Sequence, residues 1–334
     1  MKKLFYHLLL ALPIACLLPA CSDDDENGEN SSIRIVDDKN FFLDNVKYTV
    51  EEEHLVVSNY DLERLQGTAA IPSQVTFKGN TYQVQEIGKY AFLYCSTLTA
   101  ITIPSSVTSI GENAFAFCVN LTSADIPNSV TSMGDGAFLN CTKLAAITIP
   151  SSVTSIGSGA FYNCEALTSI AIPSSLTYIP PRAFFGCQGL TSVTIPSSVT
   201  SIGDAAFQDC SGLLSVTIPN KVKFIGANAF HGCSNLTSID IPNSVTAIGD
   251  YAFYYCTSLP TITIPSSVTT IGASALRWCS ALTAIHCKGA TPPTIADDTL
   301  SGIYSQATLY VPTGSLNAYQ SAPYWSNFTT IIEE

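Results

Sequence analysis

The dipeptide Ile-Pro returns every 23 residues through the middle of this 334-residue chain. Its isoleucines are Ile103, Ile126, Ile149, Ile172, Ile195, Ile218, Ile241 and Ile264. Phenylalanine, cysteine and leucine keep the same step, from Phe92 to Phe253, from Cys95 to Cys279 and from Leu98 to Leu282. A fixed period of this length without an insertion predicts a solenoid, in which each unit packs only against its neighbours.

Each unit contains a segment in which inward and outward side chains alternate. In the unit that starts at Leu236, the side chains of Leu236, Ile239 and Ile241 point inward and the residues between them point outward. The next residue, Pro242, has no N–H group, so it ends the strand at the same place in every unit. In-register strands of this kind predict a parallel β-sheet along one face of the solenoid.

The rest of each unit carries two further signals. Ser106–Gly111 reads as a second short apolar step, closed by a glycine at a turn. Ala114, Phe115, Cys118 and Leu121 follow at spacings that suit one helical or 3₁₀ turn. We therefore expect one short helical segment in every coil.

These motifs together resemble the BspA-type bacterial leucine-rich repeat, across residues 86–285. The resemblance implies a leucine-rich repeat solenoid with 23-residue coils, a parallel β-sheet on one face, short helical or 3₁₀ turns elsewhere and a cap at each end. Residues 33–85 resemble the β-rich N-terminal cap, because 75–82 reads as a strand, a Gly-Asn turn and a strand. Residues 286–334 resemble the closing cap, which covers the exposed core and strand edges of the last coil.

The N-terminus resembles a bacterial lipoprotein signal. In residues 1–20, Lys2 and Lys3 precede an apolar run that is short for a membrane span. The run ends in Leu18-Pro19-Ala20-Cys21, which resembles a lipobox, although Pro19 departs from the preferred small residue. This predicts cleavage before Cys21 and lipid attachment to it. A soluble secretory signal with an incidental cysteine is the alternative.

An acidic segment follows the predicted lipidation site. Residues 21–32 include Asp23, Asp24, Asp25 and Glu26 and contain no large apolar residue to bury after Cys21, so we expect a flexible tether. The acidic run also resembles the surface-export signal of Bacteroidota lipoproteins. It predicts an outer-membrane lipoprotein that faces the cell exterior, and a plain solvated linker is the alternative.

The nine in-register cysteines from Cys95 to Cys279 favour a structural role. Each lies three residues after a core phenylalanine, or Leu276 in the last unit, and three before a core leucine, where a thiol acts as a small apolar filler. Parallel side chains do not converge as a disulfide requires, so we expect a buried, reduced ladder, with occasional pairing as the alternative. Without a Cys-x-x-Cys or paired histidines, we expect no metal site.

The sequence argues against catalysis and nucleic-acid binding. It contains no phosphate loop, nucleophile elbow or histidine-metal motif, so we expect no enzyme activity, no catalytic residues and no cofactor. The repeat aligns His286 with Thr263 and Asp240, but strand spacing separates the ends of this column by about 10 Å, which favours a solvated surface. A net charge of −12 opposes phosphate binding, which needs clustered Lys and Arg.

Two outward surfaces are candidate binding sites. The first is a concave strand column with a hydroxyl-rich strip beside it, and its candidate contacts are Thr102, Asp125, Thr148, Thr194, Thr217, Asp240 and Thr263. The second is an aromatic ridge just after the repeat phenylalanines, whose candidate contacts are Tyr254, Tyr255 and Trp278. Simple solubility of a β-surface is the alternative for the strips, and packing between coils is the alternative for the aromatics.

Resemblance to BspA-type proteins implies a non-catalytic surface protein that adheres to host or extracellular-matrix proteins or to other bacteria. A carbohydrate-binding or scaffold component, with surface glycans as partners of the aromatic ridge, is the alternative. We expect contact with the membrane only through the lipid anchor.

Overall fold

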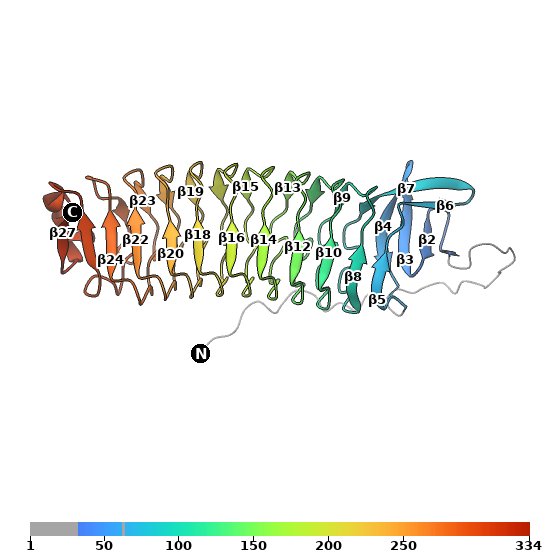
Figure 1. Cartoon of the computed structure of the whole chain (residues 1–334), viewed down its shortest axis with the longest axis horizontal. Helices are drawn as coiled ribbons and strands as arrows, with labels where there is room; N and C mark the ends of the chain where they lie inside the picture. The colour runs from blue at the N-terminus through green and yellow to red at the C-terminus, as the bar shows by residue number, and fades with distance from the viewer. Residues whose placement is uncertain (1–32, 62–63) are drawn as a thin grey trace.

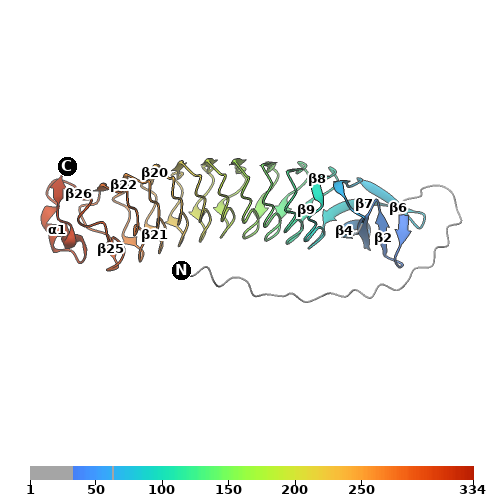
Figure 2. The ribbon, with the colours of Figure 1, turned by 90° about the horizontal axis from the view of Figure 1, so that it is seen from below.

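The computed structural model describes residues 33–61 and 64–334. Figure 1 shows the coils side by side in one long row, with a β-rich cap at the blue end and a short helical segment at the red end. Figure 2 gives the same row seen from below. The predicted leucine-rich repeat solenoid is thus confirmed.

The main sheet face is formed by the predicted strands, which pair in parallel with a register of 23 residues. Asp125, for example, lies between Thr102 and Thr148. The strands of this face are β5 (Gly67–Ala70), β8 (Leu98–Thr102), β10 (Ser123–Asp125), β12 (Ala146–Thr148), β14 (Ser169–Ala171), β16 (Ser192–Thr194), β18 (Ser215–Thr217), β20 (Ser238–Asp240), β22 (Thr261–Ile264), β24 (Ala284–Cys287), β26 (Thr308–Val311) and β27 (Ile331–Glu333).

A second sheet face arises where the sequence indicated only a short apolar step. There, two-residue strands also pair in parallel, as Met133 does with Ile110 and Ile156. The strands of this face are β4 (His54–Tyr60), β7 (Asn80–Ile87), β9 (Ser109–Ile110), β11 (Ser132–Met133), β13 (Ser155–Ile156), β15 (Tyr178–Ile179), β17 (Ser201–Ile202), β19 (Phe224–Ile225), β21 (Ala247–Ile248), β23 (Thr270–Ile271) and β25 (Thr294–Ile295).

Two prolines coincide with interruptions in these sheets. The second face separates between β13 and β15. In neighbouring coils a glycine N–H donates to the previous coil, as from Gly157 to Met133 and from Gly203 to Ile179, but Pro180 at that position cannot donate. Pro260 likewise removes a donor on the main face, where β20 and β22 belong to separate sheets.

The expected helical segment in each coil is wrong, and hydrogen bonding between coils explains why. In the second coil Ala114 and Cys118 donate their N–H groups to carbonyl oxygens three residues earlier, as in isolated turns. The intervening Phe115 and Phe117 donate to the next coil instead. Left-handed φ angles of 52° at Asn113 and 61° at Phe117 also interrupt any helix. Within the described residues, regular helix is confined to α1 (Leu316–Ser321) and the 3₁₀ helix η1 (Trp325–Asn327).

The core runs the whole length of the solenoid between the two sheet faces and the turns. Its centre is a ladder of phenylalanines from Phe92 to Phe253, all buried, whose rings stack at centroid distances of 5.0–5.7 Å. The repeat leucines, isoleucines, valines and cysteines surround these rings. Because each coil covers the next, the two terminal coils need a cover of another kind.

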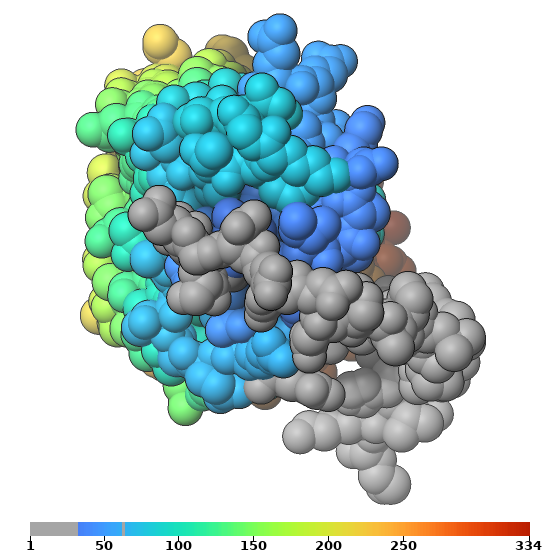
Figure 3. Space-filling model, turned by 90° about the vertical axis from the view of Figure 1, so that its right-hand side faces the viewer, coloured from blue at the N-terminus to red at the C-terminus, as the bar shows by residue number. Residues whose placement is uncertain are grey.

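The N-terminal cover consists of antiparallel strands joined to the second sheet face. Strands β1 (Ile33–Ile35), β2 (Asn40–Leu43) and β3 (Val46–Glu51) pair in order with β4, and β6 (Gln74–Phe77) forms a hairpin with β7. Figure 3 views this end, where the blue side chains of the cap form much of the surface.

The C-terminal cover combines strand and helix. Strand β27 follows β26 in the main sheet, and Figure 2 shows α1 at the red end of the solenoid. The side chain of Trp325 is buried and its indole N–H donates to the carbonyl of Pro293 over 2.8 Å. The hydroxyl of buried Tyr319 donates to Gly289 over 2.8 Å.

Several predictions concern residues beyond the described ranges. The signal peptide (1–20), the lipidation site at Cys21 and the acidic tether (21–32) all lie outside the described residues. In residues 33–61 and 64–334, no helix is long and apolar enough to cross a membrane.

Candidate binding surfaces

The predicted strand column lies on the outside of the main sheet face. Every candidate in it is exposed: Thr102, Asp125, Thr148, Thr194, Thr217, Asp240 and Thr263. The strip beside it, which includes Ser123, Ser192 and Ser238, is also exposed. Because the strands stack at the spacing of a parallel sheet, about 4.8 Å, the column presents one side chain per coil at regular intervals.

The hydroxyl groups of this column differ from those elsewhere in the coil. Threonines just before the strands donate hydrogen bonds from their hydroxyls to carbonyl oxygens of the previous coil. The Thr122 hydroxyl, for example, donates to the Thr99 carbonyl over 3.1 Å. Threonines just before the strands of the second sheet face form the same kind of hydrogen bond, for example from the Thr200 hydroxyl to the Thr177 carbonyl over 3.0 Å. No side chain among the column's seven candidate residues forms a hydrogen bond or ion pair with any described residue. Their polar groups are therefore free to bind another molecule.

At the C-terminal end of the column, His286 contacts residues that the 23-residue repeat does not predict. His286 stacks on Tyr310 with ring centroids 4.6 Å apart, and its Nδ1 lies 3.0 Å from a carboxylate oxygen of Glu334. The second Glu334 oxygen accepts from Lys288. Glu334 lies outside the repeat, so no spacing of 23 could reveal it. His286 is thus held by the C-terminal cap, and Asp240, two coils away, is in a separate sheet.

The residues directly after the repeat phenylalanines pack mainly against one another. Tyr162 stacks on Phe185 with centroids 4.4 Å apart, and His231 lies 4.9 Å from Tyr254. All four side chains are half-buried. For this part of the aromatic ridge, packing between coils accounts for the aromatic residues.

The exposed aromatic side chains lie two residues after the repeat phenylalanine, or after Leu276 in the last unit. Tyr255 is 51% exposed and Trp278 is 55% exposed. Both have left-handed backbones, with φ of 63° and 65°, at a position that the five coils from Asn140 to Gly232 fill with Asn, Gly or Asp. Bulky side chains are uncommon there because the Cβ atom approaches the following carbonyl. Strained residues that persist in a fold are candidates for function.

Two aromatic residues at the same repeat position were missing from the predicted ridge. Tyr94 and Phe117 precede Tyr255 and Trp278 by seven coils, and a 23-residue alignment would have found them. Their rings stack with centroids 4.7 Å apart. No such ring contact joins Tyr255 to Trp278: Tyr255 stacks on Tyr254 of its own coil with centroids 6.3 Å apart, and Trp278 has the Arg277 guanidinium over its ring.

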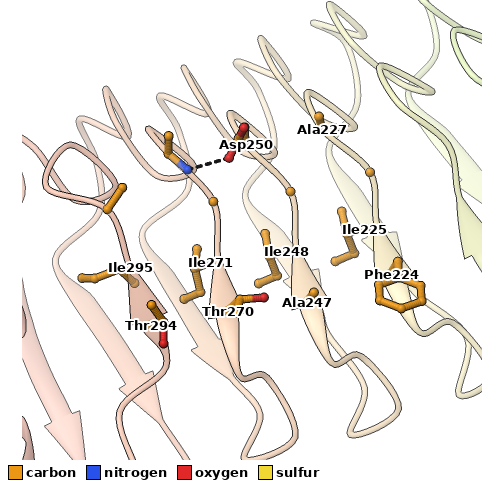
Figure 4. A pocket seen from close by; sticks show the side chains of 15 residues that line it. Phe224, Ile225, Ala227, Ala247, Ile248, Asp250, Thr270, Ile271, Thr294 and Ile295 are labelled. Carbon is orange, nitrogen blue, oxygen red and sulfur yellow. Dashed lines mark hydrogen bonds between the residues drawn. The ribbon is translucent and has the colours of Figure 1, made fainter.

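A shallow groove of about 610 Å³ runs across the C-terminal half of the second sheet face. Figure 4 shows Phe224, Ala247, Thr270 and Thr294 side by side along it. Phe224 is 57% exposed at a position that several coils fill with serine. Asp250, at the rim, accepts the backbone N–H of Ala273 over 2.8 Å, so its carboxylate serves the turn.

A smaller cavity of about 250 Å³ lies between the last full coil and the C-terminal segment. Arg277 and Trp278 line one side, and Ser301, Ile303 and Gln306 are among the residues lining the other. The guanidinium carbon of Arg277 is 5.7 Å from the Trp278 ring centroid. This cavity therefore joins an exposed aromatic residue to a cation.

The burial predicted for the repeat cysteines is confirmed, and all nine, with Cys287, have free thiols. Burial raises the pKa of Cys187 to about 12, so this thiol is protonated and a poor nucleophile at neutral pH. Among the described residues, no cluster of three or more His, Cys, Asp or Glu side chains could hold a metal ion.

The family model for the BspA type leucine rich repeat region matches residues 73–191 and 178–303, with six copies of the repeat. A leucine rich cell surface protein from Faecalibacterium prausnitzii is similar in structure, with a TM-score of 0.58 and 27% identity over 92% of this chain and 96% of its own. A leucine-rich repeat protein from Bacteroides ovatus has 26% identity over 88% of this chain and 99% of its own, with a TM-score of 0.45. No curated protein matches the sequence.

Proposed function

The chain belongs to the BspA-type leucine-rich repeat family, and from this premise we propose that it is a non-catalytic adhesion protein of the bacterial surface. Repeat solenoids of this kind generally act as binding scaffolds. The similar protein from F. prausnitzii is described as a cell surface protein, which supports the same location here. The proposed partners are host or extracellular-matrix proteins, or proteins of other bacteria.

The observation that carries the proposal is the free strand column on the main sheet face. Its exposed hydroxyls and the carboxylates of Asp125 and Asp240 have no partner among the described residues, whereas other threonines bond the neighbouring coil. An extended partner lying across the strands from Thr102 to Thr263 would meet one such group per coil, except in the coil that has Ala171 at this position. Many modest hydrogen bonds, each contributing on the order of 1 kcal/mol, would then add along its length.

The acidic chain narrows the class of partner. Its net charge of −12 disfavours nucleic acids and favours proteins with basic segments, which the two carboxylates of the column would attract. Charge complementarity of this kind mainly raises the association rate and selects the register.

A second candidate function is carbohydrate binding at the aromatic ridge. The exposed rings of Tyr255 and Trp278, in an unfavourable backbone conformation, favour it. A sugar ring has an apolar C–H face that lies flat on an aromatic ring, while its hydroxyl groups remain available for hydrogen bonds.

The location follows from the N-terminal sequence. We propose that lipid at Cys21 anchors the protein to the outer membrane and that the acidic segment 21–32 separates the solenoid from the membrane. An anchor at Cys21 that is separated from the solenoid by segment 21–32 would leave the main sheet face accessible to large partners.

Binding of the full-length protein to a combined array of immobilised matrix proteins and glycans tests these functions. Adhesion through the main sheet face predicts a protein hit that is lost when Asp125 and Asp240 are both changed to Lys. A response confined to glycans and unaffected by that change would favour the second candidate instead.

A further inference from the structure

The cavity beside Trp278 combines three features that belong to a ligand site. It is concave, with a volume of about 250 Å³, below the roughly 300–1,000 Å³ of pockets that bury a drug-sized ligand. Trp278 provides a flat ring that is 55% exposed. Arg277 provides a cation next to that ring. The size suits one ring-sized unit at the end or side of a longer chain.

Arg277 has donors to spare. Its side chain forms no ion pair or hydrogen bond with any residue in 33–61 or 64–334. The pKa of the Asp298 carboxyl is lowered first by hydrogen bonds from Ser274, whose hydroxyl donates over 2.6 Å and whose N–H donates over 3.2 Å, and last by the charge of Arg277. The five N–H donors of a guanidinium match a carboxylate in a two-bond geometry. A carboxylate is therefore the ligand group that Arg277 would recognise best.

The two exposed rings nearby are not explained by packing on each other. Tyr94 and Phe117, at the same repeat position, stack with centroids 4.7 Å apart. Tyr255 and Trp278 make no ring contact with each other: Tyr255 stacks only on Tyr254 of its own coil, with centroids 6.3 Å apart, and Trp278 stacks on no ring of the described residues. Their left-handed backbones would be less strained with Asn, which occupies the position as Asn140 and Asn163. The aromatic side chains at Tyr255 and Trp278 therefore need a reason other than coil stacking.

We propose that this cavity binds the acidic sugar residue of a glycan, with the carboxylate on Arg277 and the sugar ring on Trp278. The inference rests on the second candidate function and specifies its ligand as a uronic acid rather than a neutral sugar. Ser301, whose hydroxyl has no partner among the described residues, lies on the opposite wall and can bond a ring hydroxyl. Tyr255, one coil earlier on the ridge, extends the platform toward the next sugar unit.

The test compares two oligosaccharides that differ only in their terminal unit, glucuronic acid or glucose, by calorimetry with the full-length protein. We expect at least tenfold tighter binding of the acidic oligosaccharide. Arg277→Gln should abolish that preference, so that the acidic oligosaccharide binds no more tightly than the neutral one, while Trp278→Asn should weaken both at least tenfold. The matched control is Tyr94→Asn, which removes a similarly exposed aromatic (61%) at the same repeat position far from the cavity, and it should change neither affinity.

Each contrary result has a separate meaning. Equal binding of both oligosaccharides that still depends on Trp278 would overturn the acidic-sugar inference and leave carbohydrate binding at the ridge intact. If neither oligosaccharide binds to a protein that still binds a matrix protein, carbohydrate binding at the ridge would be overturned as well. If a peptide ending in Asp-Glu displaces the acidic oligosaccharide as well as free glucuronic acid does, Arg277 binds a carboxylate whether or not a sugar carries it, and the inference is wrong. Unchanged circular dichroism and melting temperature of Trp278→Asn would show that lost binding is not unfolding.

Discussion

The sulfur of Cys187 lies 3.1 Å from the carbonyl oxygen of Phe161 in the preceding coil, so the thiol acts as a hydrogen-bond donor inside the core. The same contact recurs in eight consecutive coils, at 3.0–3.2 Å, from Cys118 on Phe92 to Cys279 on Phe253. A thiol at this position therefore fills apolar space. It also gives the Phe161 carbonyl, which already accepts the N–H of Cys164, a second hydrogen bond that alanine or valine could not supply.

Replacing this thiol tests its dual role. Cys187→Ser should lower the free energy of unfolding by about 1–3 kcal/mol, because it leaves a gap and puts a more polar group in an apolar site. The hydroxyl can still donate to Phe161, so we expect a value near the lower limit. Urea denaturation provides the measurement, with the exposed Ser192→Ala as a control near zero. Equal stability of Cys187→Ser and the wild type would contradict the account.

The buried thiols also predict a loss of stability in alkali. Burial raises the pKa of Cys187, like that of Cys141, from about 9 to about 12. An acid whose pKa is raised by folding contributes its full stability below the unfolded value and loses it as pH rises toward the folded value. Each such thiol should therefore reduce the free energy of unfolding by up to about 1.4 kcal/mol per pH unit above about pH 9. Urea midpoints that stay constant from pH 8 to 10.5 would disprove this.

Glycine at the turn after the second sheet face is required by close approach of neighbouring coils. A Cβ atom at Gly249 would lie 2.6 Å from the backbone nitrogen of Ala227, which cannot easily move. Gly249→Ala should destabilise the protein by roughly 1–3 kcal/mol through overpacking. Ala247→Ser, two residues earlier at a half-buried position that several coils fill with serine, is the matched control and should change little. The comparison uses thermal melting, and a Gly249→Ala variant as stable as the control would show that the coils adjust.

If the protein is a lipoprotein as proposed, its attachment to the membrane depends on Cys21. Changing Cys21 to Ser removes the thiol of the predicted lipobox, so the protein should leave the membrane fraction. Cys16 is the competing candidate, but Pro13 stands where a lipobox for it would need an aliphatic residue. Fractionation with metabolic labelling by a fatty-acid analogue measures this. Cys16→Ser is the control and should retain both lipid and membrane. An acylated, membrane-bound Cys21→Ser protein would show that the anchor lies elsewhere.

The sequence predicted the repeated part of the fold well because every coil gives the same signal. The period located the strands of the main sheet face, and the positions of Phe, Cys and Leu located the core. The sequence did not predict turns in place of helical segments. Spacing within one coil cannot show that the N–H groups of residues such as Phe115 donate to the next coil.

The candidate sites were less predictable because they depend on departures from the repeat. Alignment by 23 residues would have revealed Tyr94 and Phe117 on the ridge and Phe224 in a column that several coils fill with serine. It could not reveal the pairing of His286 with Glu334, since Glu334 reaches the main sheet from the C-terminal cap. Which hydroxyls are free also depended on the structure, because threonines at several positions look alike in sequence.

The central claim is that the main sheet face binds an extended protein partner. The direct measurement is the affinity of the full-length protein for whichever of immobilised collagen, laminin or fibronectin it binds, compared between two variants of equal charge change. One variant carries Asp125→Lys and Asp240→Lys, both exposed on the strand column, and the other carries Glu53→Lys and Glu165→Lys, both exposed outside it. We predict at least a tenfold loss of affinity for the first variant and little change for the second. Equal affinities of the two variants would contradict the claim that the main sheet face binds the partner. A loss of affinity only when Tyr255 and Trp278 are replaced by Ala would contradict it too.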